Sequence, residues 1–284
     1  MDDVFLSRAR RAARKVARRV GLAQANPTVL YSSRRVCILL PSSEIVARIA
    51  PADDKSFAAE NRELAVSRYL IERGAPVVGP SAIMSSEPYI EEGMLVSLWP
   101  HIRHVKADYE DNAAVADAAG ALQRVHDAFA TYSGELPSFA DRIEECAAQL
   151  RDSSALSALD AEDRAFLLRA YDRSIRSLAR FDFSPCPIHG DAHMGNVFIT
   201  PRGPLWMDFE AASLGPREWD ATGAPHLPAF RSLDLQLYAV MKDLRSVCVT
   251  VWCSALAEDP EKRAAATYQL ERLRAASGTP VVGR

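Results

Sequence analysis

The sequence predicts an α+β protein with a small antiparallel-sheet lobe followed by a larger, mostly helical lobe. Short β-branched or aliphatic runs are concentrated between residues 28 and 103, where turn-forming residues separate them. Beyond residue 108 the apolar residues recur instead with the period of an α-helix. The length of 284 residues suits one large domain or two closely packed lobes.

Residues 1–21 are predicted to form a basic amphipathic helix. The first 20 residues contain seven arginines and lysines, and apolar residues recur among them at helical spacing up to Gly21. We expect this helix to dock on the rest of the protein with its basic side in solvent. Contact with an anionic membrane or another partner is an alternative, whereas Asp2 and Asp3 argue against an organelle transit peptide.

Residues 22–100 are predicted to form the N-lobe. Strands are expected at residues 28–31, 36–40 and 44–50, a helix at 56–72, and two further strands at 88–90 and 94–99. This order of strands, helix and strands is typical of a small nucleotide-binding lobe. Its hinge would lie at residues 96–101, which places Leu98 among the predicted nucleotide-binding residues.

Residues 101–284 are predicted to form the C-lobe. Helices are expected at residues 112–130, 139–151, 160–180, 233–257 and 260–276, and a strand pair around 188–200 and 204–209. Asp259 and Pro260 open the last helix with a side-chain cap followed by proline at the first helical position.

Composition excludes some classes of function. A net charge of -3 gives no reason to expect a nucleic-acid partner. No apolar run approaches the roughly 20 residues that a transmembrane segment needs. The five cysteines are scattered and form no C-x-x-C pair, which is typical of thiols in a reducing cytoplasm and predicts a cytoplasmic protein. The abundance of alanine and arginine points to a bacterial source with GC-rich DNA.

The region from Pro187 to Asp220 is the most informative part of the sequence. It reads P-I-H-G-D-A-H-M-G-N-V-F-I-T, then P-L-W-M-D-F-E and G-P-R-E-W-D; Asn196 lies five residues after Asp191, and Asp208 twelve further on. Phosphoryl transfer needs a carboxylate at the acceptor hydroxyl and oxygen ligands that hold Mg²⁺ on the nucleotide phosphates. The three residues supply these groups, so the region predicts a phosphoryl-transfer site.

The motifs H-G-D-A-H-x-G-N, D-F-E and G-P-x-E-W-D resemble the aminoglycoside phosphotransferase and choline kinase superfamily. The resemblance spans nearly the whole chain and implies a two-lobed, protein-kinase-like fold. It also implies an enzyme, a kinase that transfers the γ-phosphate of ATP or GTP to a hydroxyl group of a small molecule. Asp191 matches the family's catalytic aspartate, and Asn196 and Asp208 match its Mg²⁺ ligands.

Four further residues are expected to support this site. His189 would shape the catalytic loop through hydrogen bonds, and His193 would brace it, with a phosphate or substrate contact as the alternative. Glu210 replaces the glycine of the protein-kinase D-F-G motif, which removes an easy backbone flip and favours a permanently formed metal site. Asp220 resembles the family's buried aspartate, which holds the catalytic loop by hydrogen bonds to its backbone.

Arg48 is the main departure from the family pattern. In V-A-R-I it stands where the family usually has the strand lysine that contacts the nucleotide phosphates. A guanidinium can make the same charge-assisted contact, although its geometry differs. Glu63 in the following helix is the expected partner, with Glu60 as the alternative. A surface ion pair is the competing interpretation of Arg48 and its partner.

The sequence also lacks a glycine-rich loop. Tyr31-Ser32-Ser33-Arg34-Arg35 occupies the first hairpin instead, where hydroxyls and arginines could meet phosphate. Ser32 and Ser33 are therefore predicted nucleotide-binding residues.

A metal-dependent hydrolase is an alternative from another class. His189, Asp191 and His193 place three potential ligands within five residues, and His126 or His226 could complete a set. The spacing matches no known hydrolase motif, however, and it leaves the role of Asn196 unexplained.

A nucleotide-binding pseudokinase is a further alternative, suggested by Arg48 and the missing glycine-rich loop. The intact Asp191, Asn196 and Asp208 favour an active enzyme. Its acceptor stays open, because aminoglycosides, choline and other cationic amino alcohols, macrolides, sugars and homoserine-like metabolites all carry a suitable hydroxyl. The sequence distinguishes neither ATP from GTP nor one oligomeric state from another.

Overall fold

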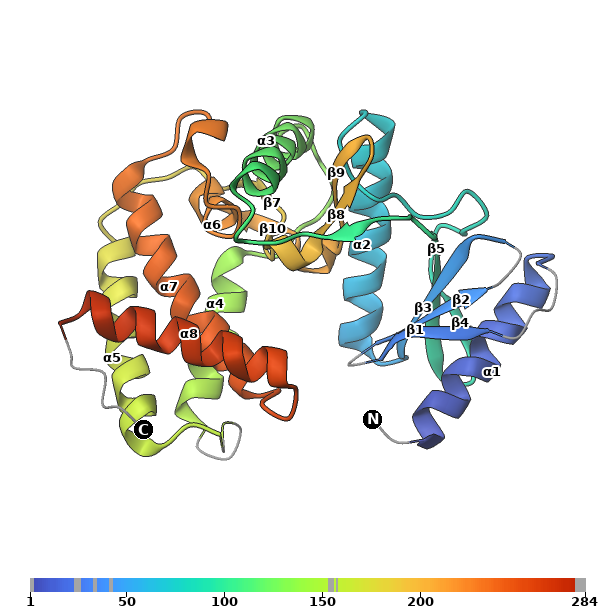
Figure 1. Cartoon of the computed structure of the whole chain (residues 1–284), viewed down its shortest axis with the longest axis horizontal. Helices are drawn as coiled ribbons and strands as arrows, with labels where there is room; N and C mark the ends of the chain where they lie inside the picture. Colours follow the sequence, from blue (N-terminus) through green and yellow to red (C-terminus); the bar gives the residue numbers. More distant parts are fainter. Residues whose placement is uncertain are drawn as a thin grey trace. The chain divides into compact units, whose positions relative to one another are not determined.

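A computed structural model of the protein describes residues 3–22, 27–32, 35–40, 43–152, 156 and 158–278. The chain forms two compact units (Figure 1). Unit 1 contains Met1–Gly134 and Asp191–Ala212, and unit 2 contains Glu135–Gly190 and Ser213–Arg284. Each unit is therefore built from two separate stretches of the sequence.

Unit 1 holds the predicted strand-rich lobe, the next long helix and the β-hairpin of the motif region. Its elements are α1 (Asp3–Arg19), β1 (Thr28–Ser32), β2 (Val36–Leu40), β3 (Ile45–Pro51), α2 (Asp54–Glu72), β4 (Tyr89–Glu91), β5 (Met94–Pro100), β6 (Val105–Lys106), α3 (Asn112–Phe129), the 3₁₀ turn η1 (Met194–Asn196), β8 (Val197–Thr200), β9 (Gly203–Trp206) and the 3₁₀ turn η2 (Phe209–Ala211).

The five-stranded sheet of unit 1 is antiparallel, with the strand order β1-β2-β3-β5-β4. Its strands lie where the sequence predicts them, within one or two residues. Arg48 of β3 is directly opposite Cys37 of β2 and Ser97 of β5. Because residues that face each other across a sheet project to the same side, these three residues share one face.

Helix α1 packs on the other, apolar face of this sheet (Figure 1). Its alanines and Val16 are buried in the same cluster as Ile38 and Ile49. The basic side of α1 remains exposed, and two of its cations, Arg11 and Lys15, pair with Glu92 in the turn between β4 and β5. The expected docking of an amphipathic helix through its apolar side is thus confirmed.

A second sheet in unit 1 contains β6, β8 and β9 and packs against α3. Trp206, at the end of β9, is fully buried, and its indole N–H donates to the backbone oxygen of Ala118 in α3 at 3.0 Å. The backbone N–H of Val78 donates to the backbone oxygen of Trp206 at 2.8 Å. These bonds join the motif hairpin to the strand-rich lobe.

The predicted boundary at residue 100 does not coincide with the division between the units. Helix α3 and residues 191–212, assigned from the sequence to the C-lobe, lie in unit 1. The physical reason is the set of bonds around Trp206, which link segments more than 80 residues apart in the sequence. Local sequence patterns carry no signal for such long-range contacts.

Unit 2 is mostly helical, as predicted for the C-lobe. Its elements are α4 (Phe139–Arg151), α5 (Ala161–Leu178), β7 (Cys186–Ile188), β10 (Ser213–Gly215), α6 (Arg217–Ala221), the 3₁₀ turn η3 (Leu227–Ala229), α7 (Leu235–Ser254) and α8 (Pro260–Ala276). Trp219 is fully buried in its core, and its ring packs edge-on against Phe139 of α4. No helix in the described parts of the chain is long and apolar enough to cross a membrane.

Candidate functional site

The hairpin of β8 and β9 brings Asn196 and Asp208 to the same end of unit 1. Val197, the first residue of β8, is directly opposite Trp206, the last residue of β9. Asn196 comes just before β8, so it lies at the end of the hairpin where the chain leaves β9. The backbone N–H of Met207 donates to the backbone oxygen of Asn196 at 3.0 Å, which continues the ladder by one pair. The eleven residues between Asn196 and Asp208 therefore form a hairpin that brings the two predicted metal ligands together.

Asp191 begins the loop that leads into this hairpin. The side-chain amide nitrogen of Asn196 donates to the backbone oxygen of Asp191 at 3.0 Å. This bond orients the amide, so its oxygen is the atom left to act as a ligand. His193 accepts a hydrogen bond at Nδ1 from the backbone N–H of Gly195 (3.0 Å), and its Nε2 lies 3.8 Å from Oδ2 of Asp191. His193 thus contacts the backbone of the turn between Asp191 and Asn196.

The backbone of Asp208 adopts the left-handed conformation, with φ 68° and ψ 60°. This region costs most side chains roughly 1–2 kcal/mol, although aspartate is among the few that visit it. Such a conformation persists when the surroundings hold it in place. Here two guanidinium groups contact the Asp208 carboxylate, Arg48 at 3.1 Å and Arg35 at 3.5 Å.

Arg48 forms the expected pair with Glu63 of α2. The distance from Nη1 of Arg48 to Oε1 of Glu63 is 2.5 Å, and Nη2 of Arg48 lies 3.1 Å from Oδ1 of Asp208. Both Arg48 and Glu63 are buried, which excludes the alternative of a solvated surface pair. The guanidinium fork connects α2 to Asp208, and a lysine, with its single side-chain nitrogen, cannot contact both carboxylates in the same way.

Arg35, directly before β2, is a second cation in this site. It contacts carboxylates from two parts of the chain: Glu63 at 3.3 Å and Glu60 at 3.5 Å, both in α2, and Asp208 and Glu210 in the motif region. From the sequence, Arg35 was only one residue of a candidate phosphate-binding hairpin. Its convergence with these carboxylates had no sequence signal, because the pairs with Asp208 and Glu210 span more than 170 residues.

Glu60 is the partner of Arg35 and is held from the sheet side by Ser97. The hydroxyl of Ser97 donates to Oε1 of Glu60 and itself accepts from the indole N–H of Trp99 at 2.8 Å. Ser97 was missed in the sequence, although its place opposite Arg48 follows from strand pairing. The cluster therefore contains two arginines and four carboxylates, of Glu60, Glu63, Asp208 and Glu210.

Burial and crowding of like charges perturb the carboxyl groups of this cluster. Burial, together with the neighbouring Asp208 and Glu60, raises the pKa of Glu63 from 4.5 to about 7, against the opposing effect of Arg48 and Arg35. Burial and Asp208 also raise the pKa of Glu210. The pKa of Arg48 is held well above its usual value by Glu63 and Asp208 despite burial. Both arginines are therefore permanent cations.

In unit 2, Asp220 holds the residues that lead into Asp191. Its carboxylate is fully buried and accepts from the backbone N–H groups of His189 at 2.7 Å and Gly190 at 2.9 Å. The indole N–H of Trp219 donates to the backbone oxygen of Gly190 at 2.8 Å. Gly190 has φ 81°, a conformation that glycine adopts without steric cost, and Asp191 follows it directly in the chain.

The predicted nucleotide-binding residue Leu98 projects to the opposite face of the sheet from Arg48. The side chain of Leu98 is fully buried in the apolar cluster of the sheet. Its backbone N–H donates to the sulfur of Met84 at 3.1 Å, and its backbone oxygen accepts from Ser81 at 2.9 Å. Leu98 therefore faces away from Arg48, because adjacent strand residues alternate between faces. Ser32 is exposed at the end of β1, and Ser33 lies outside the described residues.

The hydrolase alternative is not supported. Within the described ranges, no group of three or more His, Cys, Asp or Glu side chains is placed to hold a metal ion. His189, Asp191 and His193 thus do not form a ligand set of their own. Asn196 and Asp208 do fit Mg²⁺, since this ion is usually held by one or two protein oxygens together with substrate phosphates.

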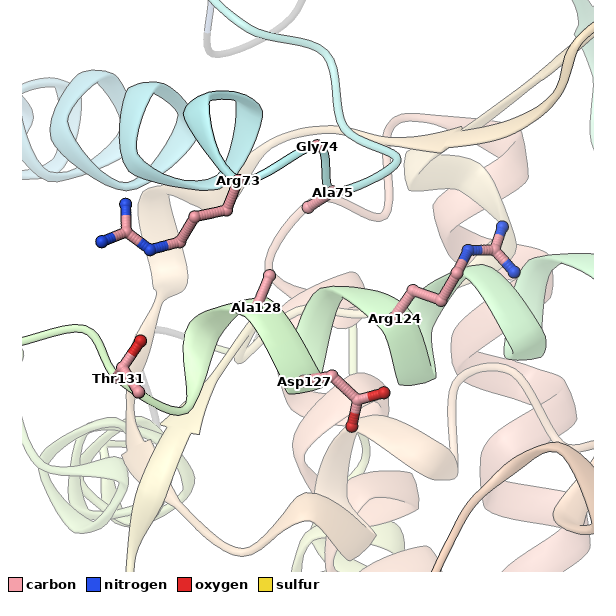
Figure 2. Close-up of a pocket in the computed structure, with 7 residues that line it drawn as sticks. All are labelled: Arg73, Gly74, Ala75, Arg124, Asp127, Ala128 and Thr131. Carbon is pink, nitrogen blue, oxygen red and sulfur yellow. The ribbon is translucent and has the colours of Figure 1, made fainter.

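A pocket of about 450 Å³ lies elsewhere in unit 1. Figure 2 shows the residues that line it. It is lined by Arg73, Gly74, Ala75, Arg124, Asp127, Ala128 and Thr131. The guanidinium groups of Arg73 and Arg124 point away from each other, so they do not converge on a common anion. Arg73 follows Glu63 by ten residues, which is roughly 15 Å along α2. This pocket is therefore distinct from the arginine–carboxylate cluster.

The sequence matches the profile of the "Phosphotransferase enzyme family" over residues 28–275. The chain belongs to this family. It is therefore a phosphotransferase with an alcohol group as acceptor. A search of curated proteins finds no match.

Solved structures show that this phosphotransferase has the protein-kinase-like fold. The GDP and kanamycin complex of APH(2")-IIia has 15% identity and a TM-score of 0.69, over 93% of this chain and 98% of that chain. Amicoumacin kinase hAmiN with AMP-PNP, Ca²⁺ and Ami has 14% identity and a TM-score of 0.68, over 98% of both chains. A choline/ethanolamine kinase family protein from Mesorhizobium loti has 15% identity and a TM-score of 0.65, over 98% and 95%.

Proposed function

We propose that this phosphotransferase moves the γ-phosphate of ATP or GTP, with Mg²⁺, to a hydroxyl group of a small molecule. The observation that carries the proposal is the arrangement in unit 1. The β8–β9 hairpin joins Asn196 and Asp208, and Arg48 links Asp208 to the buried Glu63. Nucleotides in the similar structures, GDP and AMP-PNP, support a nucleotide donor.

Each residue of the site has a defined task in this proposal. Asp191 orients the acceptor hydroxyl and takes its proton as the new bond to phosphorus forms. The amide oxygen of Asn196 and the carboxylate of Asp208 hold the metal, and Arg48 contacts the nucleotide phosphates. Mg²⁺, when bound, neutralises charge on the phosphate oxygens. Catalysis then rests on positioning and electrostatics, with no covalent enzyme intermediate.

The acceptor is a small molecule with a hydroxyl group. Kanamycin and Ami are bound in two similar structures, and a third belongs to the choline/ethanolamine kinase family. Choline and aminoglycosides are cations, so a cationic alcohol is the first class to screen.

Thermal unfolding with and without Mg²⁺–ATP and Mg²⁺–GTP tests the nucleotide site. Ligand at about 100 times its dissociation constant adds roughly 2.7 kcal/mol to the free energy of unfolding, which raises Tm by several degrees. The shift should require the metal and disappear in Asp208→Ala. A shift in the wild type with one of the two nucleotides identifies the phosphate donor. That nucleotide is then used to screen acceptors for phosphate transfer. Absence of a shift with both nucleotides would refute the proposed donor site, and binding without transfer to any acceptor would favour the pseudokinase.

A further inference from the structure

Arg35 contacts the carboxylate of Asp208, the proposed metal ligand. Its guanidinium lies 3.5 Å from Oδ1 of Asp208, the same oxygen that Arg48 contacts at 3.1 Å, and it also pairs with Glu210. Two cations on one carboxylate oxygen disfavour a third, because like charges repel strongly where water is partly excluded. Asp208 is therefore a poor ligand for a metal ion until one of these arginines moves.

Of the two arginines, Arg35 is the more exposed, although it also contacts Glu60 and Glu63 in α2. The Arg48 side chain is 9% exposed and is fixed at both ends of its fork, by Glu63 and Asp208. The Arg35 side chain is 17% exposed, and it projects from the start of β2, next to hairpin residues. Its partner Glu210 is 43% exposed, so that contact is the most accessible to solvent.

The position of Arg35 is within reach of phosphate oxygens on the same ion. Oxygen ligands lie about 2.1 Å from Mg²⁺, so a phosphate oxygen and a carboxylate oxygen on one ion are at most about 4.2 Å apart. A guanidinium that now touches Asp208 therefore needs only a side-chain rotation to reach such a phosphate. Its planar fork suits bidentate contact with two phosphate oxygens.

We propose that Arg35 is a second phosphate-binding residue. When the metal–nucleotide complex binds, its guanidinium moves away from Asp208 and Glu210 and contacts the nucleotide phosphates. The proposal rests on the proposed function and adds to it. Arg35 takes the place of the backbone contacts of a glycine-rich loop, which this hairpin lacks. Metal binding then depends on nucleotide. A metal ion alone brings no anion that could replace Asp208 and Glu210 as partners of Arg35.

The test compares metal binding with nucleotide binding in one variant. Mn²⁺ alone is titrated and its free fraction followed by electron paramagnetic resonance, and the nucleotide complex is titrated by calorimetry. Arg35→Gln should bind Mn²⁺ alone about tenfold more tightly and the Mg²⁺–nucleotide complex about tenfold more weakly, a change of about 1.4 kcal/mol in opposite directions. Arg11→Gln makes the same charge change on the exposed side of α1 and should match the wild type in both titrations.

Arg35→Lys keeps the charge and provides a second variant if Arg35→Gln fails to fold. It should bind Mn²⁺ as the wild type does, with nucleotide affinity between those of wild type and Arg35→Gln. The proposal is overturned if Arg35→Gln weakens both ligands, because Arg35 would then only support the loop, or if neither affinity changes. A wild type that binds no nucleotide would instead refute the proposed function, and this inference with it.

Discussion

Replacing Glu63 with glutamine should make the stability of the protein relative to wild type depend on pH. Glu63 is fully buried between Arg48 and Arg35, and burial raises its pKa from 4.5 to about 7 in the folded state. Between pH 4.5 and about pH 7, Glu63 is therefore protonated in the folded protein and ionised in the unfolded chain. The free energy of unfolding therefore falls as pH rises through this window.

The magnitude follows from the size of the pKa shift. A difference between 4.5 and about 7, at 1.36 kcal/mol for each pKa unit, corresponds to about 3 kcal/mol between the low-pH and high-pH limits. Glutamine resembles the protonated acid in shape and does not titrate. Glu63→Gln should therefore become more stable relative to wild type as pH rises, by about 2–3 kcal/mol between pH 5 and pH 8.

Urea unfolding of both proteins at pH 5, 6, 7 and 8 measures this difference. Glu72→Gln places the same substitution at an exposed residue near the end of the same helix. Its difference from wild type should stay constant with pH. If the Glu63→Gln difference is also constant, or falls with pH, then Glu63 is ionised throughout the range and the reasoning from burial is wrong.

Three other substitutions test the site more directly. Asp191→Asn should lower phosphate transfer by about 10²–10⁴-fold while nucleotide affinity is kept, and equal turnover to wild type would rule out Asp191 as the base. Arg48→Lys should weaken nucleotide binding about tenfold in calorimetry, because an ammonium group cannot bridge Glu63 and Asp208 as the fork does; unchanged affinity would count against a phosphate contact. Asp220→Ala leaves two buried N–H groups without an acceptor, so unfolding in urea should show a loss of about 2–5 kcal/mol, and a loss below 1 kcal/mol would contradict this role.

Local sequence patterns were sufficient to predict the long helices and the strands of the five-stranded sheet, but not the short elements β6, β10 and α6. The strands at 36–40 and 94–99 and the helices at 139–151 and 260–276 are all present within one residue of the predicted bounds. The resemblance to the family led to the pairing of Arg48 with Glu63, a strand residue and a residue in the next helix. Such contacts are close in the sequence, so the sequence contains most of the information about them.

Leu98 shows what strand pairing adds to sequence order. Its side chain lies on the opposite face of the sheet from Arg48, because adjacent strand residues alternate between faces. The division of the chain into units was missed. Trp206 reaches Ala118 across 88 residues, and a contact of that kind has no local signature.

The sequence by itself determined the elements, the family and the phosphoryl-transfer motif of this protein, because each depends on residue type at short and regular spacing. Beyond the Arg48–Glu63 pair, only the tertiary structure decided which charges meet. It placed Arg35 among the carboxylates of Glu60, Glu63, Asp208 and Glu210, and it set the backbone of Asp208 in the left-handed conformation. A charged side chain on a strand or a hairpin has no preferred distant partner until packing brings one within a few ångströms. Electrostatic clusters of this kind therefore become visible only in the folded chain.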